Sequence, residues 1–339
     1  MRVLAALDKF RGTATAAEAS AAVGQAGWSL GFDVDEVPMS DGGEGLVDVL
    51  GGTNRASTVT GPLGAPVRAA WRLSGRRAVI EMANASGLVL AGGAEGNDPL
   101  GATTRGTGEL LDLAAEQGAR TIVVGLGGSA TTDGGLGAVE AMRSPARYRA
   151  IDLQVACDVR TRFVDAAAVF APQKGATPAQ VALLTARLER LADRYLTTYG
   201  VDVREVDGTG AAGGLAGGLL AFGGRISSGF EVVADHVDLD ERLEAATAVV
   251  TGEGYLDGQS LDGKVVGSVA ARAVAAGKPV VVVVGAADSD ATARLVALGD
   301  ADAPVTVVSL VETYGEKRAF AEPQWCIEHA ATDALRALG

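Results

Sequence analysis

The sequence predicts an α/β fold of two domains, one with a mainly parallel sheet and one with a mixed sheet. Near both ends of the chain, short apolar strands alternate with helices through polar, glycine-containing loops, which is typical of a parallel sheet. From about residue 55, short alternating strands follow one another through Gly-Pro and Ser-Gly turns with no room for helices, which indicates antiparallel pairing. The middle of the chain is therefore expected to form a domain inserted into, or following, the first α/β unit.

The first α/β portion begins with an expected strand at residues 2–7 (RVLAAL) and a polar loop. Thr15 and Glu18 then form a capping box at the start of a helix. A strand at 32–38 and the loop 40–45 (SDGGEG) repeat the pattern. Because ligands of parallel α/β sheets bind at the carboxyl ends of the strands, both loops are candidate site loops.

The rest of the chain continues this alternation, with regular α/β structure again from residue 265. The other expected strands are 55–60, 67–73, 78–82, 121–124, 153–157, 247–251, 279–284 and 305–310. The other expected helices lie near 104–117, before 142, at 178–195, after the glycine run 208–218, and at the C-terminus.

Composition and charge narrow the function classes. The net charge of −13 argues against nucleic-acid binding, so an anionic ligand has to be met by local cations and backbone amides. No apolar run reaches the ~20 residues of a membrane span, and Asp8 interrupts the apolar start, so a cytoplasmic protein is expected. Cys157 and Cys326 make neither a disulfide framework nor a zinc set. His236 and His329 lie outside the glycine-rich loops, which disfavours a Ser–His–Asp triad.

The most distinctive stretch is residues 121–137, TIVVGLGGSATTDGGLG. A β-branched run typical of a buried strand leads into glycines interleaved with Ser129, Thr131, Thr132 and Asp133. Glycine lets a ligand approach the main chain, free amides and hydroxyls can hold phosphate oxygens, and a carboxylate can hold Mg²⁺ or a proton. The alternative is a glycine-rich turn with no function.

Two segments partly match known nucleotide motifs. Residues 208–213 fit G-x-G-x-x-G after a possible strand at 201–206, but a single match in a chain with 47 glycines is weak support for NAD binding. Residues 258–264 have the spacing of a phosphate-binding loop, yet Val265 stands where Ser or Thr should bind Mg²⁺. The lysine that ends this segment is still a candidate phosphate contact.

Charged and polar side chains gather in glycine-containing loops and at loop–helix junctions, several of them directly after expected strands. They are Asp8, Lys9, Arg11, Asp41, Glu44, Arg105, Ser129, Thr131, Asp133, Asp158, Gln173, Lys174, Glu253, Asp257 and Lys264. Phosphoryl transfer requires this combination, with carboxylates for Mg²⁺ and the acceptor hydroxyl, and cations and amides for the transferred phosphate. Polar turns alone explain any one loop but not the whole set.

Nine ordered segments resemble the motifs of the bacterial-type glycerate kinases, which phosphorylate D-glycerate with ATP. They are DKFRGTATAAEA, VPMSDGGEG, EMANASGL, DPLGATTRGTGEL, GLGGSATTDGGLG, VACDV, VFAPQKGAT, GAAGGLAGGLLAF and TGEGYLDGQSLDGK. The resemblance implies two α/β domains with an active-site cleft between them, Mg²⁺-ATP as donor and a small hydroxy acid as acceptor, used generally at its 2-hydroxyl. We expect a Rossmann- or flavodoxin-like domain from residues 1–55 and 265–339, and the inserted domain from 56–264. A homodimer is possible.

Within this resemblance the candidate residues take expected roles. Asp41 and Asp133 either bind Mg²⁺ or receive the substrate proton, Asp158 is a further metal candidate, and Lys9 is the catalytic cation. The residues expected to bind substrate or phosphate are Asp8, Arg11, Gly42, Gly43, Glu44, Arg105, Gly127, Gly128, Ser129, Thr131, Gln173, Lys174, Glu253, Asp257 and Lys264.

The chain also departs from the family pattern. The region 143–150 (RSPARYRA) is shorter than in relatives, LDKFRG replaces PDSFKG, and Tyr255 stands where the GEGR-type motif has Arg. Arg160 and Arg162 lie in a changed segment after the VACDV strand. These changes leave two alternatives open, a kinase for a different small hydroxy acid and a ligand-binding paralogue without catalysis.

Overall fold

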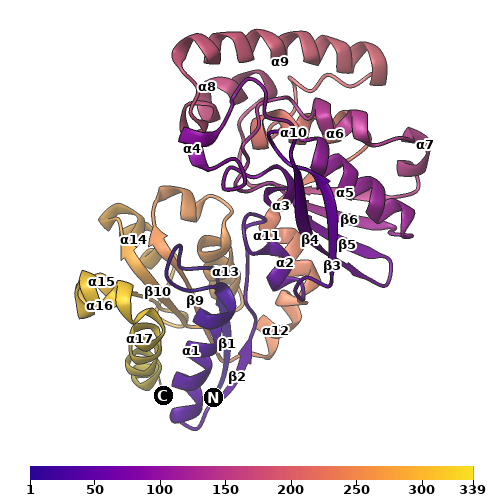
Figure 1. The fold of residues 1–339 in the computed structure, drawn as a ribbon. Helices are drawn as coiled ribbons and strands as arrows, with labels where there is room; N and C mark the ends of the chain where they lie inside the picture. The colour runs from indigo at the N-terminus through magenta and orange to yellow at the C-terminus, as the bar shows by residue number, and fades with distance from the viewer. Residues whose placement is uncertain (339) are drawn as a thin grey trace. The chain divides into compact units, whose positions relative to one another are not determined.

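The computed structural model describes residues 1–338 (Figure 1). The chain divides into two compact units, the first made of residues 1–41 and the chain from Phe230 onward, the second of residues 42–229. The sequence-based boundaries at 55 and 265 lie elsewhere. Residues 230–264 group with the first unit because strand β9 pairs with β1 on one side and β10 on the other.

The sheet of the first unit is entirely parallel and has the order β11-β10-β9-β1-β2. Its strands are β1 (Arg2–Leu7), β2 (Asp33–Glu36), β9 (Ala248–Leu256), β10 (Val280–Ala287) and β11 (Val305–Ser309). Numbered within the unit, this order is 2-1-3-4-5, which is the flavodoxin-like arrangement. The order reverses between β1 and β9, and ligands of such sheets bind at the carboxyl ends of the strands at that reversal.

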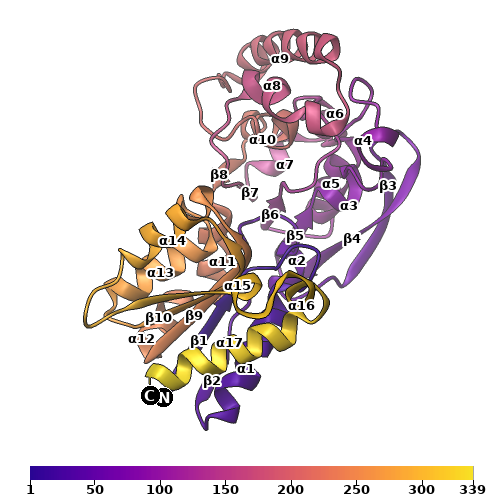
Figure 2. The ribbon, with the colours of Figure 1, turned by 90° about the vertical axis from the view of Figure 1, so that its left-hand side faces the viewer.

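Helices cover both faces of this sheet. Helices α1 and α17 pack against each other and against the face that carries Val3, Ala5 and Leu7 (Figures 1 and 2). Helices α12 and α13 pack against the strands from the other face. The helices are α1 (Ala16–Ser29), α11 (Gly229–His236), α12 (Leu239–Ala245), α13 (Val265–Ala275), α14 (Ser289–Val296), α15 (Leu310–Tyr314), α16 (Glu316–Ala321) and α17 (Pro323–Leu338).

The predicted capping box at the start of α1 is confirmed. The Glu18 amide donates to Thr15 Oγ1 at 3.2 Å, and the Thr15 amide donates to Glu18 Oε2 at 2.8 Å. Both bonds satisfy amides that the first helical turn leaves without partners.

The sheet of the second unit is mixed, as predicted. Strands β3 (Arg55–Thr60), β4 (Pro66–Ser74) and β5 (Arg77–Glu81) are antiparallel neighbours. Strands β6 (Thr121–Gly125), β7 (Asp152–Ala156) and β8 (Arg225–Ser227) continue from β5 in parallel. The helices are α2 (Leu46–Val49), α3 (Ala83–Ser86), α4 (Gly93–Gly96), α5 (Arg105–Glu116), α6 (Leu136–Ala141), α7 (Pro145–Tyr148), α8 (Ala166–Phe170), α9 (Pro178–Tyr199) and α10 (Ala211–Ala221).

The glycine run 208–218 does not follow a strand, because residues 201–206 form turns and irregular structure. The prediction of a strand there is wrong. The G-x-G-x-x-G match therefore lacks the preceding strand that a dinucleotide-binding motif requires. The run instead enters α10 through a kink at Ala212–Gly214, where all three φ angles are positive. A Cβ on Gly213 would collide with the Thr131 backbone, so this glycine lets α10 pack closely against the loop after β6.

None of the helices in residues 1–338 is long and apolar enough to span a membrane.

Candidate functional site

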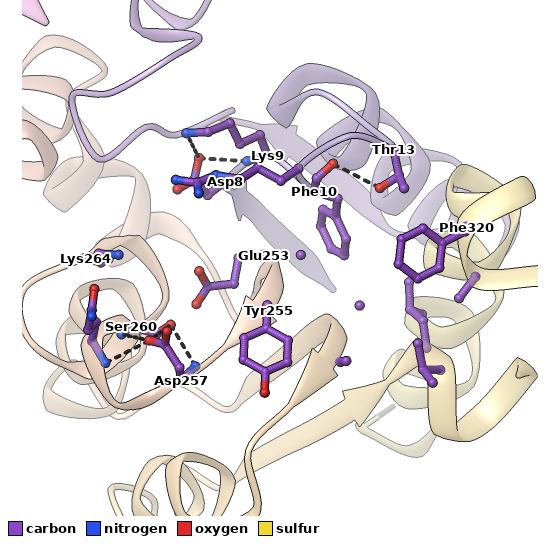
Figure 3. Close-up of a pocket in the computed structure, with 18 of the residues that line it drawn as sticks. Asp8, Lys9, Phe10, Thr13, Glu253, Tyr255, Asp257, Ser260, Lys264 and Phe320 are labelled. Atoms are coloured by element: carbon purple, nitrogen blue, oxygen red, sulfur yellow. Dashed lines mark hydrogen bonds and ion pairs between the residues drawn. The ribbon is translucent and has the colours of Figure 1, made fainter. Parts of the chain in front are cut away.

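A cavity of about 450 Å³ lies in the first unit where the order of strands reverses. This volume is in the range of small-ligand sites. Residues that follow β1 line it together with residues from the end of β9 (Figure 3). The charged side chains that line it are Asp8, Lys9, Arg11, Asp41, Glu253, Asp257 and Lys264. The structure therefore brings together seven of the predicted site residues from distant parts of the sequence.

Asp8 and Asp41 share one lysine. Lys9 Nζ lies 3.7 Å from Asp8 Oδ1 and 3.5 Å from Asp41 Oδ1. Asp8 is buried, and burial raises the pKa of its carboxyl to about 6; the Asp41 charge also raises it, whereas Lys9 and Lys264 lower it. Lys9 therefore lies between two carboxylates and offsets part of their repulsion.

Glu253 is the most perturbed acid of this cavity. Burial raises its pKa to about 7, and the charges of Asp8 and Asp257 add to the rise, whereas Ser260 and Lys264 lower it. Its Oε1 is buried and has no hydrogen-bond partner among the described residues. A buried carboxylate oxygen without a donor is costly, so this atom is available to a ligand, a proton or a cation.

Asp257 has a structural task in the same cavity wall. Its Oδ1 accepts hydrogen bonds from the amides of Gln259 at 2.8 Å and Ser260 at 3.1 Å. It thereby caps the short helix Gly258–Leu261, and α13 then starts directly after Lys264. This turn places the ammonium of Lys264 near Glu253 (Figure 3).

The other end of the cavity is apolar and aromatic. Phe10, Tyr255 and Phe320 line it, with the two phenylalanines on the side away from Lys264 in Figure 3. Tyr255 and Phe320 are 54% and 61% exposed. The Tyr255 hydroxyl donates to Asp288 Oδ1 at 2.7 Å.

A second group of predicted residues lies in the unit of residues 42–229, at the carboxyl end of β6. The amides of Gly127, Gly128 and Ser129 donate no hydrogen bond within the part of the chain described. Gly128 has a φ of 70°, which turns the chain sharply after the strand. Successive unpaired amides in such a turn can bind an anion.

Lys174 supports this loop from inside the unit. Its side chain is buried, and its Nζ donates to Ser129 Oγ at 2.6 Å and to the Thr131 carbonyl at 2.7 Å. Asn97 Nδ2 also donates to the carbonyls of Ala130 and Lys174, at 3.0 and 2.9 Å. The ammonium therefore contacts the loop itself and does not extend into solvent.

Asp133 accepts four hydrogen bonds from residues of its own unit. Its Oδ2 accepts from the Thr104 amide and hydroxyl, both at 2.8 Å, and from the Gly137 amide at 3.2 Å. Its Oδ1 accepts from the Gly135 amide at 3.1 Å. Burial raises the pKa of Asp133, and these donors oppose the rise. The carboxylate ties the starts of α5 and α6 to the loop, and it also lines a second cavity, of about 520 Å³, within this unit.

The remaining predicted residues of this unit have mixed surroundings. Arg105 is exposed and pairs with Glu109 on its own helix at 3.1 Å, and Gln173 is exposed. Asp158 Oδ1 accepts from the Gly229 amide at 3.0 Å. The segment Gly42, Gly43 and Glu44 packs against the loop after β6, because a Cβ on Gly127 would lie 3.0 Å from the Glu44 amide.

Sequence reasoning missed several supporting residues. Glu81 accepts from the amides of Gly45 and Val47 at 3.1 and 2.8 Å, and so fixes the start of α2. Asn97 and Thr104 hold the loop after β6, as described above. Only Glu81, the last residue of a strand, carried a signal that could have marked it.

The shortened region 143–150 lies away from these loops. The region contains α7 and directly precedes β7, so it lies at the amino end of that strand. The loop after β6 lies at the opposite, carboxyl end, because β6 and β7 are parallel. Tyr148 is buried against Phe222, with ring centroids 5.3 Å apart, and Arg147 pairs with Asp112 at 3.4 Å. The short connection is thus packed into the core of its unit.

Comparison with known proteins agrees with this arrangement. The model of the glycerate kinase family matches residues 3–145 and 141–339. The chain belongs to the glycerate kinase family. The two matched segments of the family model meet at residues 141–145, next to the region that is short in this chain.

Curated relatives in the glycerate kinase family span most of the chain. It is 38% identical over 330 residues to glycerate 2-kinase of Escherichia coli K12, covering 86% of each protein. It is 37% identical over 333 residues to glycerate kinase of Bacillus subtilis 168, covering 86% of this chain and 87% of the relative. The crystal structure of a provisionally assigned glycerate kinase 2 from Salmonella typhimurium LT2 has a TM-score of 0.83 and 33% identity, covering 100% of this chain and 98% of that one.

Proposed function

We propose that this kinase transfers the γ-phosphoryl group of ATP to D-glycerate, at the 2-hydroxyl. The observation that carries the proposal is the cluster of Asp8, Lys9, Asp41, Glu253 and Lys264 around one cavity at the strand reversal. Phosphoryl transfer to an alcohol needs positioning and charge neutralisation, which cations and carboxylates in one cavity can supply. The relatives named glycerate kinase support the choice of acceptor.

In this proposal Glu253 receives the proton of the acceptor hydroxyl. Its pKa of about 7 leaves a large fraction of the carboxylate ionised at neutral pH while keeping it basic enough to take a proton. Lys9, Arg11 and Lys264 neutralise the carboxylate of the acid and the phosphate of the donor. In the unit of residues 42–229, the unpaired amides of Gly127–Ser129 are a separate group of donors that can hold phosphate oxygens.

The residues of the cavity also fit Mg²⁺. No three His, Cys, Asp or Glu side chains within residues 1–338 are grouped to hold a metal ion by themselves. Mg²⁺ in kinases, however, commonly uses one or two carboxylates together with substrate phosphates and water. Asp8 and Asp41 offer hard oxygen ligands beside a neighbouring cation, and we propose them in place of Asp133 and Asp158. The bound ion would neutralise charge on the donor phosphates.

The test is an ADP-release assay on the purified protein with Mg²⁺-ATP and a panel of small hydroxy acids that includes both enantiomers of glycerate. We expect the highest kcat/KM with D-glycerate, and ³¹P NMR of the product should show phosphate on the 2-oxygen. Phosphate on the 3-oxygen would support the kinase activity but contradict the proposed 2-position. Absence of ADP release with every acid would contradict the proposal.

A second acceptor has specific support. Tyr255 replaces the family's Arg at the cavity, so the charged groups that line this cavity differ from the family pattern, and Arg160 and Arg162 follow β7 in the other unit. A different small hydroxy acid would then exceed glycerate in the same panel. A binding paralogue without catalysis would instead bind an acid in calorimetry and release no ADP.

A cytoplasmic location and a homodimer stay predictions.

A further inference from the structure

Ser129 and Lys174 form a close pair that the proposed kinase chemistry does not use. Lys174 Nζ donates to Ser129 Oγ at 2.6 Å, and its second bond, to the Thr131 carbonyl at 2.7 Å, fixes its direction. Lys174 is only 3% exposed and forms no ion pair within the described residues. A buried lysine without a carboxylate partner is uncommon because desolvation of the ammonium is costly.

The surroundings favour the neutral amine of Lys174. Burial lowers its pKa to about 7, and the charge of Asp133, the acid that acts on it, opposes this change. Asp133 is itself held by hydrogen bonds from Thr104, Gly135 and Gly137 and makes no ion pair with Lys174. When Lys174 loses its proton, the Ser129 hydroxyl can become the donor of their shared hydrogen bond, which is the arrangement of a nucleophile and its base.

Ser129 also lies beside groups that can hold an anion. It is half-buried, whereas Lys174 lies behind it. The amides of Gly127, Gly128 and Ser129 are without acceptors in the described residues. A nucleophile, an oriented base and free amide donors therefore occupy one short loop, and covalent catalysis uses these three elements together.

We propose that Ser129 is a nucleophile, with Lys174 as its base, and that it accepts a phosphoryl group from a nucleoside triphosphate. Oγ of Ser129 forms a bond to the γ-phosphorus while its proton passes to the neutral Nζ of Lys174. The bond from that phosphorus to the bridging oxygen breaks, and the nucleoside diphosphate leaves with the electron pair. The new phosphate takes the free amides of residues 127–129, so the phosphorylated enzyme should bind the phosphates of its nucleotide donor more weakly.

The inference rests on the proposed function only for the identity of the donor, so the test uses two donors. The full-length protein is incubated without any hydroxy acid, once with Mg²⁺-ATP and once with acetyl phosphate. Intact mass and peptide mapping then locate the added group. We expect one phosphoryl group on Ser129, and a rate about tenfold higher at pH 8 than at pH 6, since a base with a pKa of about 7 changes its neutral fraction by that factor.

Three variants separate nucleophile, base and control. Ser129→Ala and Lys174→Met should take up no phosphate. Lys278→Met should label like the wild type, because Lys278 also donates to a carbonyl, that of Glu244 at 3.2 Å, but belongs to the other unit and is not the partner of Ser129. A folded Lys174→Met that labels at the wild-type rate overturns the role of the base. If this variant does not fold, the wild-type pH profile decides, and a flat rate overturns the role.

The outcomes for the two proposals can be told apart. Turnover of glycerate without any label on Ser129 from either donor overturns the nucleophile and leaves the kinase intact. Phosphate on Ser129 without turnover of any hydroxy acid supports the proposal that Ser129 is a nucleophile and contradicts the proposed kinase function. Label on other residues alone also overturns the proposal.

Discussion

Glu253, near the carboxyl end of β9, and Asp133, in the glycine-rich loop after β6, are two acids that meet opposite conditions in their respective units. Glu253 has a buried oxygen without a hydrogen-bond partner, and its pKa is raised to about 7. Both oxygens of Asp133 are occupied by donors of its own unit, from Thr104, Gly135 and Gly137. Both are carboxyl groups whose pKa is raised by burial, and the number of donors around their oxygens distinguishes the acid available to a substrate from the acid that holds the fold.

The two lysines of these regions differ in the same way. Lys9 lies between the carboxylates of Asp8 and Asp41, so its charge stays paired in the cavity. Lys174 is buried and donates to one hydroxyl and one carbonyl of its loop, without a carboxylate to stabilise its charge.

The comparison predicts first that Glu253→Gln lowers kcat with D-glycerate by ~10²–10⁴-fold, because the amide cannot take the hydroxyl proton. Steady-state kinetics at pH 8 measure this, and circular dichroism should show an unchanged fold. Glu316→Gln, at an exposed position of α16, is the matched control and should keep wild-type kcat. If Glu253→Gln keeps the wild-type kcat, Glu253 does not receive the proton of the acceptor hydroxyl.

Asp133→Asn should act on stability instead. The amide replaces one acceptor oxygen by a donor facing amides and hydroxyls, and the lost bonds should cost about 2–3 kcal/mol of the free energy of unfolding. Urea unfolding measures this against Asp235→Asn, an exposed aspartate whose replacement should change little. A stable Asp133→Asn protein without activity would instead return Asp133 to the catalytic residues.

Sequence patterns predicted the parallel and mixed sheets and the charged residues around the cavity of the first unit. Polar loops after strands such as β1 and β9 carry enough signal, because the carboxyl ends of parallel strands bind ligands. They could not show that β9 pairs with β1, which decides both the domain boundary and the meeting of Asp8 with Glu253. Nor could they reveal the brace on Asp133, since its donors Thr104, Gly135 and Gly137 are set by how α5 and α6 pack.

The pH dependence of stability sharpens the contrast further. The pKa of Glu253 is raised from 4.5 to about 7 on folding, so its contribution to stability is complete below pH 4.5 and is lost as the pH rises through 7. Glu253→Gln removes this loss. After allowance for partial solvent exposure, the variant should exceed the wild type by about 1–2 kcal/mol at pH 8 and equal it near pH 4.5. Thermal melts at both values measure this, and a difference of equal size at both would contradict the assignment.

Tyr148→Phe gives the smallest expected effect. The Tyr148 hydroxyl is buried and takes no part in the proposed chemistry. The oxygen has no hydrogen-bond partner among residues 1–338, and the ring packs edge-on against Phe222 at the amino end of β7. Tyr148→Phe keeps the ring and removes the unpaired group, so it should stabilise the protein by up to about 1 kcal/mol and leave kcat unchanged. Denaturant unfolding and steady-state kinetics measure both. A loss of activity in Tyr148→Phe would mean that the region 143–150 influences the site. The unpaired Tyr148 oxygen would then have a role in activity, as is proposed for the unpaired oxygen of Glu253.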